Sequence, residues 1–397
     1  MTVTVTDVPR DVPRGLHGVI VTDTAIGDVR GAEGFYHYRQ YSAIDLATEC
    51  TMEDVWCLLI DGELPDATAR RAFSAEVTPL RHLPPDLVLL LAPIARAGGG
   101  PLDPLRSALS MAGAVRGVRP LYDLDHDARR ADALSACALT PTLVAALHRL
   151  RHGRDPVAPR DDLPYAANYL YMLTGSEPDP RIARAIERYL ISTIDHGYNA
   201  STFTARVIAS TGADLFACLG GALGSLSGPL HGGAPSRALD TLDEIGAVER
   251  IDEVIRTKVL AGERIMGFGH PVYRTTDPRS EMLRGIAEDI GGDLVEFAVQ
   301  VERRALATLA ELKPGRALHT NVEFYAGVVM EQCGLPRDLF TPTFATSRVI
   351  GWCANILEQA QDRKIIRPAA RYVGPTPPEP VPSPRQQPAG HPGDGPA

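Results

Sequence analysis

Three histidines lie in segments that could carry chemistry, because glycines stand beside them. These segments are Gly-Pro-Leu-His231-Gly-Gly-Ala, Gly-Phe-Gly-His270-Pro-Val-Tyr and Asp-His196-Gly. Glycine has no side chain, so the backbone beside such a histidine can approach a ligand closely. The alternative for each residue is a partly buried structural histidine. The spacing matches no zinc-binding pattern, and we therefore expect no metal site.

Four arginines near these segments could bind anions. Arginine is mostly exposed in proteins, so a surface ion pair is the simplest explanation for most of them. Arg348 is the exception, because apolar residues that include Phe344 and Trp352 flank it. A guanidinium in such surroundings requires a carboxylate or phosphate for its planar fork. The four residues are Arg274, Arg279, Arg348 and Arg367.

A carboxylate, Glu323, follows Thr-Asn-Val and precedes an apolar run. Apolar surroundings raise the pKa of a carboxyl group toward the value that a general base needs. The same residue could equally be an acid in the first turn of a helix, where the helix dipole favours negative charge. The sequence by itself leaves both interpretations open.

Helices must position these residues, because the helical period dominates the chain. Apolar residues recur at helical spacing over residues 180–195 and again from about Asp293 to Leu312. Capping and proline signals predict two further helices, one from Thr51 to Gly62 and one from Pro84 to Arg96.

Strand signals are confined to the N-terminal part. Two β-prone runs, Gly18–Thr22 and Phe35–Arg39, flank a Gly/Asp-rich turn and predict a small hairpin. No alternation of strands and helices follows, and no GxGxxG motif succeeds a strand. The predicted fold class is therefore mainly α.

Composition limits the class of protein. The chain has 397 residues, of which 44% are hydrophobic, and a formal net charge of -9. Such a chain can bury a large core, which excludes global disorder. An excess of acid argues against nucleic acid or an anionic membrane as the main partner, since phosphates attract basic faces.

Three further features favour a soluble cytoplasmic enzyme. Residues 1–14 contain no apolar stretch typical of a signal peptide. The uncharged stretch Leu215–Ser236 is long enough to span a bilayer, but its glycines and Pro229 favour a packed helix followed by a site lined by backbone. The six cysteines form no CxxC pair, which is consistent with reduced core thiols.

Taken together, these motifs resemble the citrate synthases, a family that includes the 2-methylcitrate synthases. The resemblance runs in order from about Gly15 to Gly374 and is strongest to the shorter bacterial members called citrate synthase 2. The blocks that carry it include Asp195-His196-Gly-Tyr-Asn-Ala-Ser-Thr, Gly-Pro-Leu-His231-Gly-Gly-Ala, Gly-Phe-Gly-His270 through Asp-Pro-Arg279, Asn-Val-Glu323-Phe-Tyr and Arg348-Val-Ile-Gly-Trp.

The resemblance implies an all-helical homodimer in which a small domain closes over the substrates. Mapped onto this chain, the large domain would comprise residues 15–227 and 337–373, and the small domain residues 228–336. Residues 1–14 would be a flexible lead-in. Residues 374–397, rich in Pro and Gly, are expected to be a disordered tail because they cannot bury enough apolar surface.

The resemblance also implies roles for individual residues in the condensation of acetyl-CoA with oxaloacetate, without a metal or a bound cofactor. His231 would polarise the thioester carbonyl, Glu323 would take a proton from the acetyl methyl group, and His270 would act on the ketone of oxaloacetate. The carboxylates of oxaloacetate would be held by His196, Arg279, Arg348 and Arg367, the last from the other subunit. Arg274 would contact CoA.

Two departures from the family keep alternatives open. Glu323 stands where many members have Asp, and a displacement of about 1 Å can cost roughly a hundredfold in rate. A weak paralogue that only binds CoA or a dicarboxylate is therefore one alternative. Pro271 is more frequent among methylcitrate-type sequences, and a pocket discriminates one methylene by only about 1–3 kcal/mol. A 2-methylcitrate synthase that uses propionyl-CoA is the other alternative.

Overall fold

The fold was analysed in a computed structural model. It describes residues 12–229, 231–232, 234–269, 272–316 and 318–380, with no side-chain description for 234–236. The predicted active-site residue His270 and its neighbour Pro271 lie outside these residues. The chain divides into two units, residues 1–365 and 366–397. All helices and strands described below belong to the first unit.

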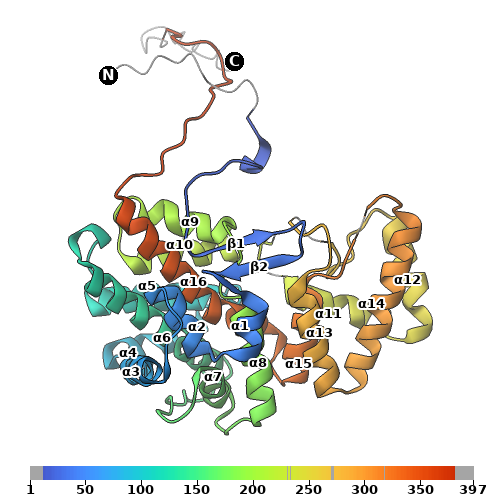
Figure 1. The fold of residues 1–397 in the computed structure, drawn as a ribbon, viewed down its shortest axis with the longest axis horizontal. Coiled ribbons are helices and arrows are strands. Elements are labelled where there is room, and N and C mark those ends of the chain that lie inside the picture. Colours follow the sequence, from blue (N-terminus) through green and yellow to red (C-terminus); the bar gives the residue numbers. More distant parts are fainter. Residues whose placement is uncertain (1–11, 230, 233, 270–271, 317, 381–397) are drawn as a thin grey trace, which may run out of the picture. The chain divides into compact units, whose positions relative to one another are not determined.

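The described residues form sixteen α-helices and one small sheet, which confirms the predicted mainly α fold (Figure 1). The helices are α1 (Ala43–Glu49), α2 (Met52–Asp61), α3 (Ala67–Val77), α4 (Pro85–Arg96), α5 (Asp103–Arg116), α6 (His126–Arg151), α7 (Tyr165–Thr174), α8 (Pro180–Ser192), α9 (Ala200–Ala209), α10 (Leu215–Leu226), α11 (Ala234–Ile245), α12 (Ile251–Leu260), α13 (Pro278–Ile290), α14 (Asp293–Leu312), α15 (Val322–Gln332) and α16 (Phe340–Asp362).

Several helix ends follow the capping chemistry read from the sequence. In α2 the side chain of Thr51 accepts from the backbone of Asp54, whose carboxylate accepts in turn from the backbone of Thr51. This reciprocal capping satisfies two N–H groups that the helix itself cannot pair. The helix ends at Gly62, which has a left-handed φ of 96°. The predicted beginning and end of α2 are therefore confirmed.

The sheet corrects one prediction. Its strands are β1 (Gly27–Arg30), β2 (Phe35–Tyr38) and β3 (Tyr41–Ser42), paired antiparallel in that order. The expected first strand, Gly18–Thr22, is wrong, because β1 lies in the segment expected to be the turn. A tight turn, in which Glu33 N–H donates to the Arg30 carbonyl (3.0 Å), joins β1 directly to β2. The short connection outweighs the strand propensity of the earlier run.

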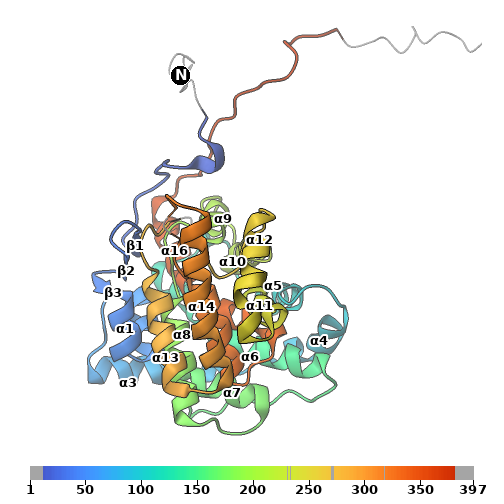
Figure 2. The same ribbon diagram turned by 90° about the vertical axis from the view of Figure 1, so that its right-hand side faces the viewer.

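The helices pack in two groups. α16 contacts α6, α9, α10, α2 and α8, and its side chains are almost all buried. Helices α11 to α15 pack mainly on one another, with contacts from α15 and α13 to α8 (Figures 1 and 2). Both groups belong to the unit of residues 1–365, and the predicted domain borders near residues 228 and 336 stay a prediction.

Among the residues that the structure describes, one helix is apolar enough to cross a membrane by length and composition. This is α6, with a mean hydropathy of 1.3 over 18 residues, but 89% of that stretch is buried inside the protein. A central helix of a large core has the same properties. The uncharged stretch that begins at Leu215 forms the buried helix α10, as expected.

The contact between α16 and the segment before Asp195 is close enough to require glycine. A Cβ atom added to Gly351 would lie 2.1 Å from the carbonyl oxygen of Ile194. In α10, by contrast, a Cβ atom added to Gly220 would meet nothing within 4 Å. The backbone of α16 therefore lies directly on the loop that carries Asp195 and His196.

We expect Gly351→Ala to lower the free energy of unfolding by about 1–3 kcal/mol, because the added methyl group forces the helix away from Ile194. Gly220→Ala is the matched control and should raise it slightly, because alanine restricts the unfolded chain. Denaturant unfolding measures both. Equal effects of the two substitutions would show that the close approach does not hold α16 in place.

Candidate active site

The hairpin determines where α8 ends. The buried hydroxyl groups of Tyr36 and Tyr38, on one face of β2, donate to the carbonyl oxygens of Ser192 and Ile191, each at 2.9 Å. The last carbonyls of a helix lack partners within it, and here the two phenols supply them. Helix α8 consequently ends at Ser192, three residues before the predicted limit of 195. The chain then turns into the segment that contains Asp195 and His196.

His196 lies between aromatic rings at the end of this segment. Its Nε2 is 2.9 Å from the hydroxyl oxygen of Tyr273, and its ring is tilted against the rings of Tyr36 and Tyr273 at 5.4 and 5.5 Å. The preceding carboxylate, Asp195, accepts from Gly197 N–H (3.1 Å) and from the Asn355 amide (3.3 Å). Burial raises the pKa of Asp195 to about 6, although Arg348 lowers it. Asp195 therefore orients the loop rather than facing solvent.

Arg348 is buried in α16, as its apolar neighbours predicted. Only 3% of the residue is exposed, its guanidinium lies 4.5 Å from the centre of the Phe344 ring, and its Nε donates to the Thr193 carbonyl (2.9 Å). Burial lowers the pKa of Arg348, and the nearby Asp195 carboxylate opposes this shift. Within the described residues Arg348 forms no direct ion pair, so part of its fork is free for an anionic ligand.

His231 is held by a hydrogen-bond network from two helices. Its Nε2 lies 2.8 Å from the hydroxyl oxygen of Ser201 in α9, which also accepts from the indole N–H of Trp352 in α16 (3.2 Å). Burial, together with the charge of Arg348, lowers the pKa of His231 to about 4. The imidazole is therefore neutral at neutral pH.

The glycines beside these histidines serve close packing within the protein. A Cβ atom at Gly232 would lie 2.3 Å from the Leu226 carbonyl oxygen. Gly267 has φ 87°, and a Cβ atom there would lie 2.8 Å from the Phe324 ring. At both positions a side chain is excluded by neighbouring residues, so the glycines do not by themselves indicate a ligand.

Arg279 forms a buried pair with Asp277 at the beginning of α13. Its Nε and Nη2 donate to the two carboxylate oxygens at 3.0 and 2.8 Å, and the two side chains are 4% and 1% exposed. Burial lowers the pKa of Arg279, but the Asp277 carboxylate outweighs it and keeps the pKa raised. Asp277 also caps α13 by accepting from Arg279 N–H (3.1 Å).

Glu323 lies in the first turn of α15, close to the same pair. Asn321 caps this helix by accepting from Glu323 N–H (3.0 Å), and Asp277 accepts from Val322 N–H (3.1 Å). Burial raises the pKa of Glu323 to about 7, although Arg279 lowers it. The position in the first turn is therefore confirmed. The raised pKa suits a base that works near neutrality, and the role of Glu323 as a general base stays a prediction.

The loops that precede His270 and Glu323 are joined by backbone hydrogen bonds. Phe268 and Thr320 form an isolated antiparallel bridge. On either side of it, Gly269 N–H donates to the His319 carbonyl (2.7 Å), and Asn321 N–H donates to the Gly267 carbonyl (2.9 Å). Two segments far apart in sequence are thereby fixed side by side.

Tyr189 is a site residue that sequence reasoning missed. It lies on the apolar face of α8, and the residue is only 1% exposed. Its hydroxyl group nevertheless has no hydrogen-bond partner among the residues that the structure describes. Burial raises its pKa, and the charges of Arg348, Arg279 and Glu323 act on it. An unpaired buried hydroxyl group beside two buried arginines is suited to an anionic ligand.

Three predicted site residues are not brought into this cluster by the described structure. The side chain of Arg274 is exposed, while its backbone N–H donates to Gly31 in the turn of the hairpin (2.9 Å). Arg367 belongs to the second unit, and His270 lies outside the described residues. The cluster itself comprises His196, His231, Arg279, Glu323 and Arg348.

Comparison with known proteins identifies the family. The family model of the citrate synthase C-terminal domain matches residues 15–369. A citrate synthase of Deinococcus radiodurans is 37% identical over 92% of this chain and 96% of its own length. The chain belongs to the citrate synthase family. A putative citrate synthase 2 of Mycobacterium tuberculosis is 40% identical over 94% of this chain and 96% of its own.

Solved structures support the same family assignment. The crystal structure of citrate synthase from Pyrobaculum aerophilum has a TM-score of 0.86 and 34% identity, over 94% of this chain and 95% of that one. A citrate synthase of Thermoplasma acidophilum, solved with carboxymethyl-CoA and oxaloacetate, has a TM-score of 0.85 and 26% identity, over 94% and 98% of the two chains. The chain is therefore an enzyme of the acyltransferase type, and the 2-methylcitrate alternative is not favoured.

We expect Asp277→Asn to lower the free energy of unfolding by about 3–5 kcal/mol, because it leaves the buried Arg279 without its counter-charge. Asparagine retains the oxygen that caps α13, so the lost stability measures the ion pair with Arg279. Asp252→Asn is the control. Asp252 lies in the first turn of α12 and pairs with Arg304 of α14, but its side chain is 57% exposed. The free energy of unfolding should fall much less in this control variant. Comparable losses in chemical unfolding would contradict a special role for Asp277.

Proposed function

We propose that this chain condenses acetyl-CoA with oxaloacetate and water to give citrate and CoA at the cluster described above. The observation that carries the proposal is a partly buried carboxylate, Glu323, whose pKa is raised to about 7, beside the buried Arg279. Proton abstraction next to a carbonyl requires such a base, and a dicarboxylate requires fixed cations. The names of the family members support the same reaction.

Oxaloacetate would be held by groups from several elements. Arg348 and Arg279 supply charge, and His196 supplies a ring nitrogen. We add Tyr189, whose unpaired hydroxyl group can donate to a carboxylate. Arg367 would complete the cage from the second subunit of a homodimer. Arg348, Arg279 and His196 are each held by hydrogen bonds within the protein, so little reorganisation of these three is needed on binding.

The first chemical step would be enolisation of acetyl-CoA. Glu323 takes a proton from the methyl carbon, and neutral His231 donates a hydrogen bond to the thioester oxygen. This donation requires the proton on Nδ1, so that Nε2 accepts from the Ser201 hydroxyl group, which must then give up its hydrogen bond to Asn199 Oδ1 (2.8 Å) when the substrate binds. The lowered pKa of His231 favours this form, because a neutral imidazole carries one donor and one acceptor.

The enol carbon would then attack the ketone carbon of oxaloacetate while His270 gives a proton to the ketone oxygen. The resulting citryl thioester is cleaved by water, which releases CoA and citrate. Arg274 would contact CoA, for which its exposed side chain is accessible. No metal or bound cofactor takes part in these steps. We also propose a cytoplasmic location, which the six unpaired cysteines support.

The direct test is the release of free CoA thiol from acetyl-CoA and from propionyl-CoA in the presence of oxaloacetate. We expect turnover with acetyl-CoA and weaker turnover with propionyl-CoA. Purified protein that binds both substrates but releases no thiol would contradict the proposal.

The pH profile provides a second test. Glu323 must be ionised to act as a base, so kcat/KM should fall about tenfold for each pH unit below about 7. His231 remains neutral throughout this range and adds no further change. Asp277→Asn should move the midpoint to lower pH, because it removes a negative charge and frees Arg279. A profile that is flat from pH 5 to 8 would exclude Glu323 as the base.

Substitutions of Glu323 test whether this side chain, which is one methylene longer than the Asp of many family members, acts as the base. Glu323→Gln should reduce turnover by several orders of magnitude, while oxaloacetate binding, measured by calorimetry, stays nearly unchanged. Glu323→Asp should slow the reaction about tenfold or more, since the site is built around the longer side chain. Faster turnover in the Asp variant would instead identify this chain as a weakened synthase.

Mixed dimers test the contribution of Arg367. Subunits with His270→Ala and subunits with Arg367→Ala should each be inactive alone. If Arg367 acts in the neighbouring subunit, a heterodimer contains one site in which both residues are intact, and activity returns. Heterodimers that form without recovering activity would show that Arg367 does not act across the dimer.

A further inference from the structure

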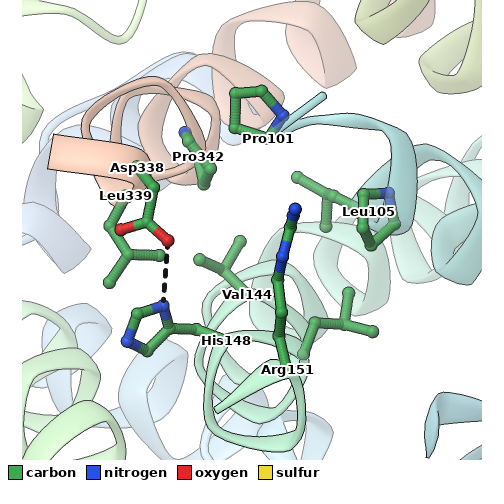
Figure 3. A pocket seen from close by; sticks show the side chains of 10 residues that line it. Pro101, Leu105, Val144, His148, Arg151, Asp338, Leu339 and Pro342 are labelled. Carbon is green, nitrogen blue, oxygen red and sulfur yellow. Dashed lines mark ion pairs between the residues drawn. The ribbon is translucent and has the colours of Figure 1, made fainter. Parts of the chain in front are cut away.

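Two histidines and an aspartate meet away from the candidate active site. His148 and His152 lie one turn apart at the C-terminal end of α6, and Asp338 belongs to the 3₁₀ turn Arg337–Leu339, which precedes α16. One ligand atom of each residue lies within 4.8 Å of those of the other two. Figure 3 shows His148 and Asp338 facing each other at the edge of a small cavity.

His152 is held in the form that binds metal ions. Its Nδ1 is 2.9 Å from the carbonyl oxygen of His148, and a carbonyl oxygen can only accept. The Nδ1 atom therefore carries the proton, and the lone pair is on Nε2. Metal-binding histidines typically donate their second ring N–H to a carbonyl or carboxylate in this way, which fixes the orientation of the ring.

The spacing of His148 and Asp338 is close to that of two ligands on one ion. Nδ1 of His148 lies 3.8 Å from a carboxylate oxygen of Asp338, which is beyond hydrogen-bond distance. Two ligands of a tetrahedral zinc ion, each about 2.0–2.1 Å from the metal, are about 3.4 Å apart. A small side-chain rotation closes the difference. The two imidazole rings are already adjacent, with centres 4.3 Å apart.

The surroundings of the three residues leave room for a further ligand and provide an electrostatic field that favours a cation. The cavity of about 30 Å³ beside His148 can hold a water molecule as a fourth ligand. The C-terminal end of a helix carries partial negative charge, which favours a cation. Three nearby arginines, Arg149, Arg151 and Arg154, oppose it. Arg149 donates to the carbonyls of Asp155 and Leu173, and Arg151 reaches toward that of Gly99.

We propose that His148, His152 and Asp338 bind one divalent transition-metal ion, of the type of Zn²⁺, that fastens the turn before α16 to the end of α6. Two imidazoles and one carboxylate suit zinc better than calcium or magnesium, which prefer oxygen ligands. None of these residues belongs to the candidate active site, so the ion is structural. This proposal departs from the expectation of no metal site, because a pair of histidines four residues apart is only part of a zinc pattern and Asp338 is far along the chain.

The test is metal binding by chelator-treated, full-length protein. Titration with Zn²⁺ in a calorimeter, and with Co²⁺ followed by its visible absorption, should show one tight ion per chain without thiolate bands. His152→Ala should weaken binding about tenfold or more, and Asp338→Asn should do the same. Both side chains are largely exposed, so these variants should fold. Zn²⁺ should raise the unfolding temperature of the unmodified protein and not of the His152 variant.

His82→Ala is the matched control, because His82 forms an exposed pair with Asp161 at 3.0 Å without a second histidine. This variant should bind Zn²⁺ as the unmodified protein does. Equal affinity in the unmodified protein and in His152→Ala would overturn the proposal, as would thiolate bands in the Co²⁺ spectrum. Turnover should be the same in His152→Ala and the unmodified protein.

Discussion

The carboxylate of Asp277 is the interaction on which the arrangement of charges depends. It caps α13, pairs with Arg279 through two hydrogen bonds, and accepts from the backbone next to Glu323. Its negative charge permits a guanidinium to stay ionised in a buried position, where an unpaired charge would be prohibitively costly. One side chain thus fixes Arg279, the proposed substrate-binding cation, and α15, which carries the proposed base Glu323, relative to each other.

Burial then gives the base and its partner their properties. The same loss of solvent raises the pKa of Glu323 to about 7 and lowers that of His231 to about 4. Both shifts favour the neutral form, but the consequences differ, because a carboxyl group becomes a stronger base while an imidazole remains uncharged. Loss of solvent at each of the two groups can therefore serve opposite purposes in the proposed reaction.

Much of the fold and part of the site could be predicted from the sequence. Local signals sufficed to predict α2, α14 and the burial of Arg348, because helix caps, hydrophobic periodicity and apolar neighbours all lie within a short stretch of the sequence. The wrong strand at Gly18–Thr22 shows the limit, since propensity there competed with a turn that only the paired structure reveals. Ser201 and Tyr189 were missed, because their importance arises from partners on other helices.

The capping of α8 by the hairpin has a consequence for how the chain folds. Tyr36 bonds to a carbonyl 156 residues later in the chain, and Arg348 bonds to one 155 residues earlier. Contacts over such separations require large loops to close, which makes them slow to form. Most helices can form from local contacts, whereas the catalytic centre has to wait for both ends of the chain. A nascent chain that lacks α16 lacks Arg348 and Trp352, and with them two of the contacts that build the site.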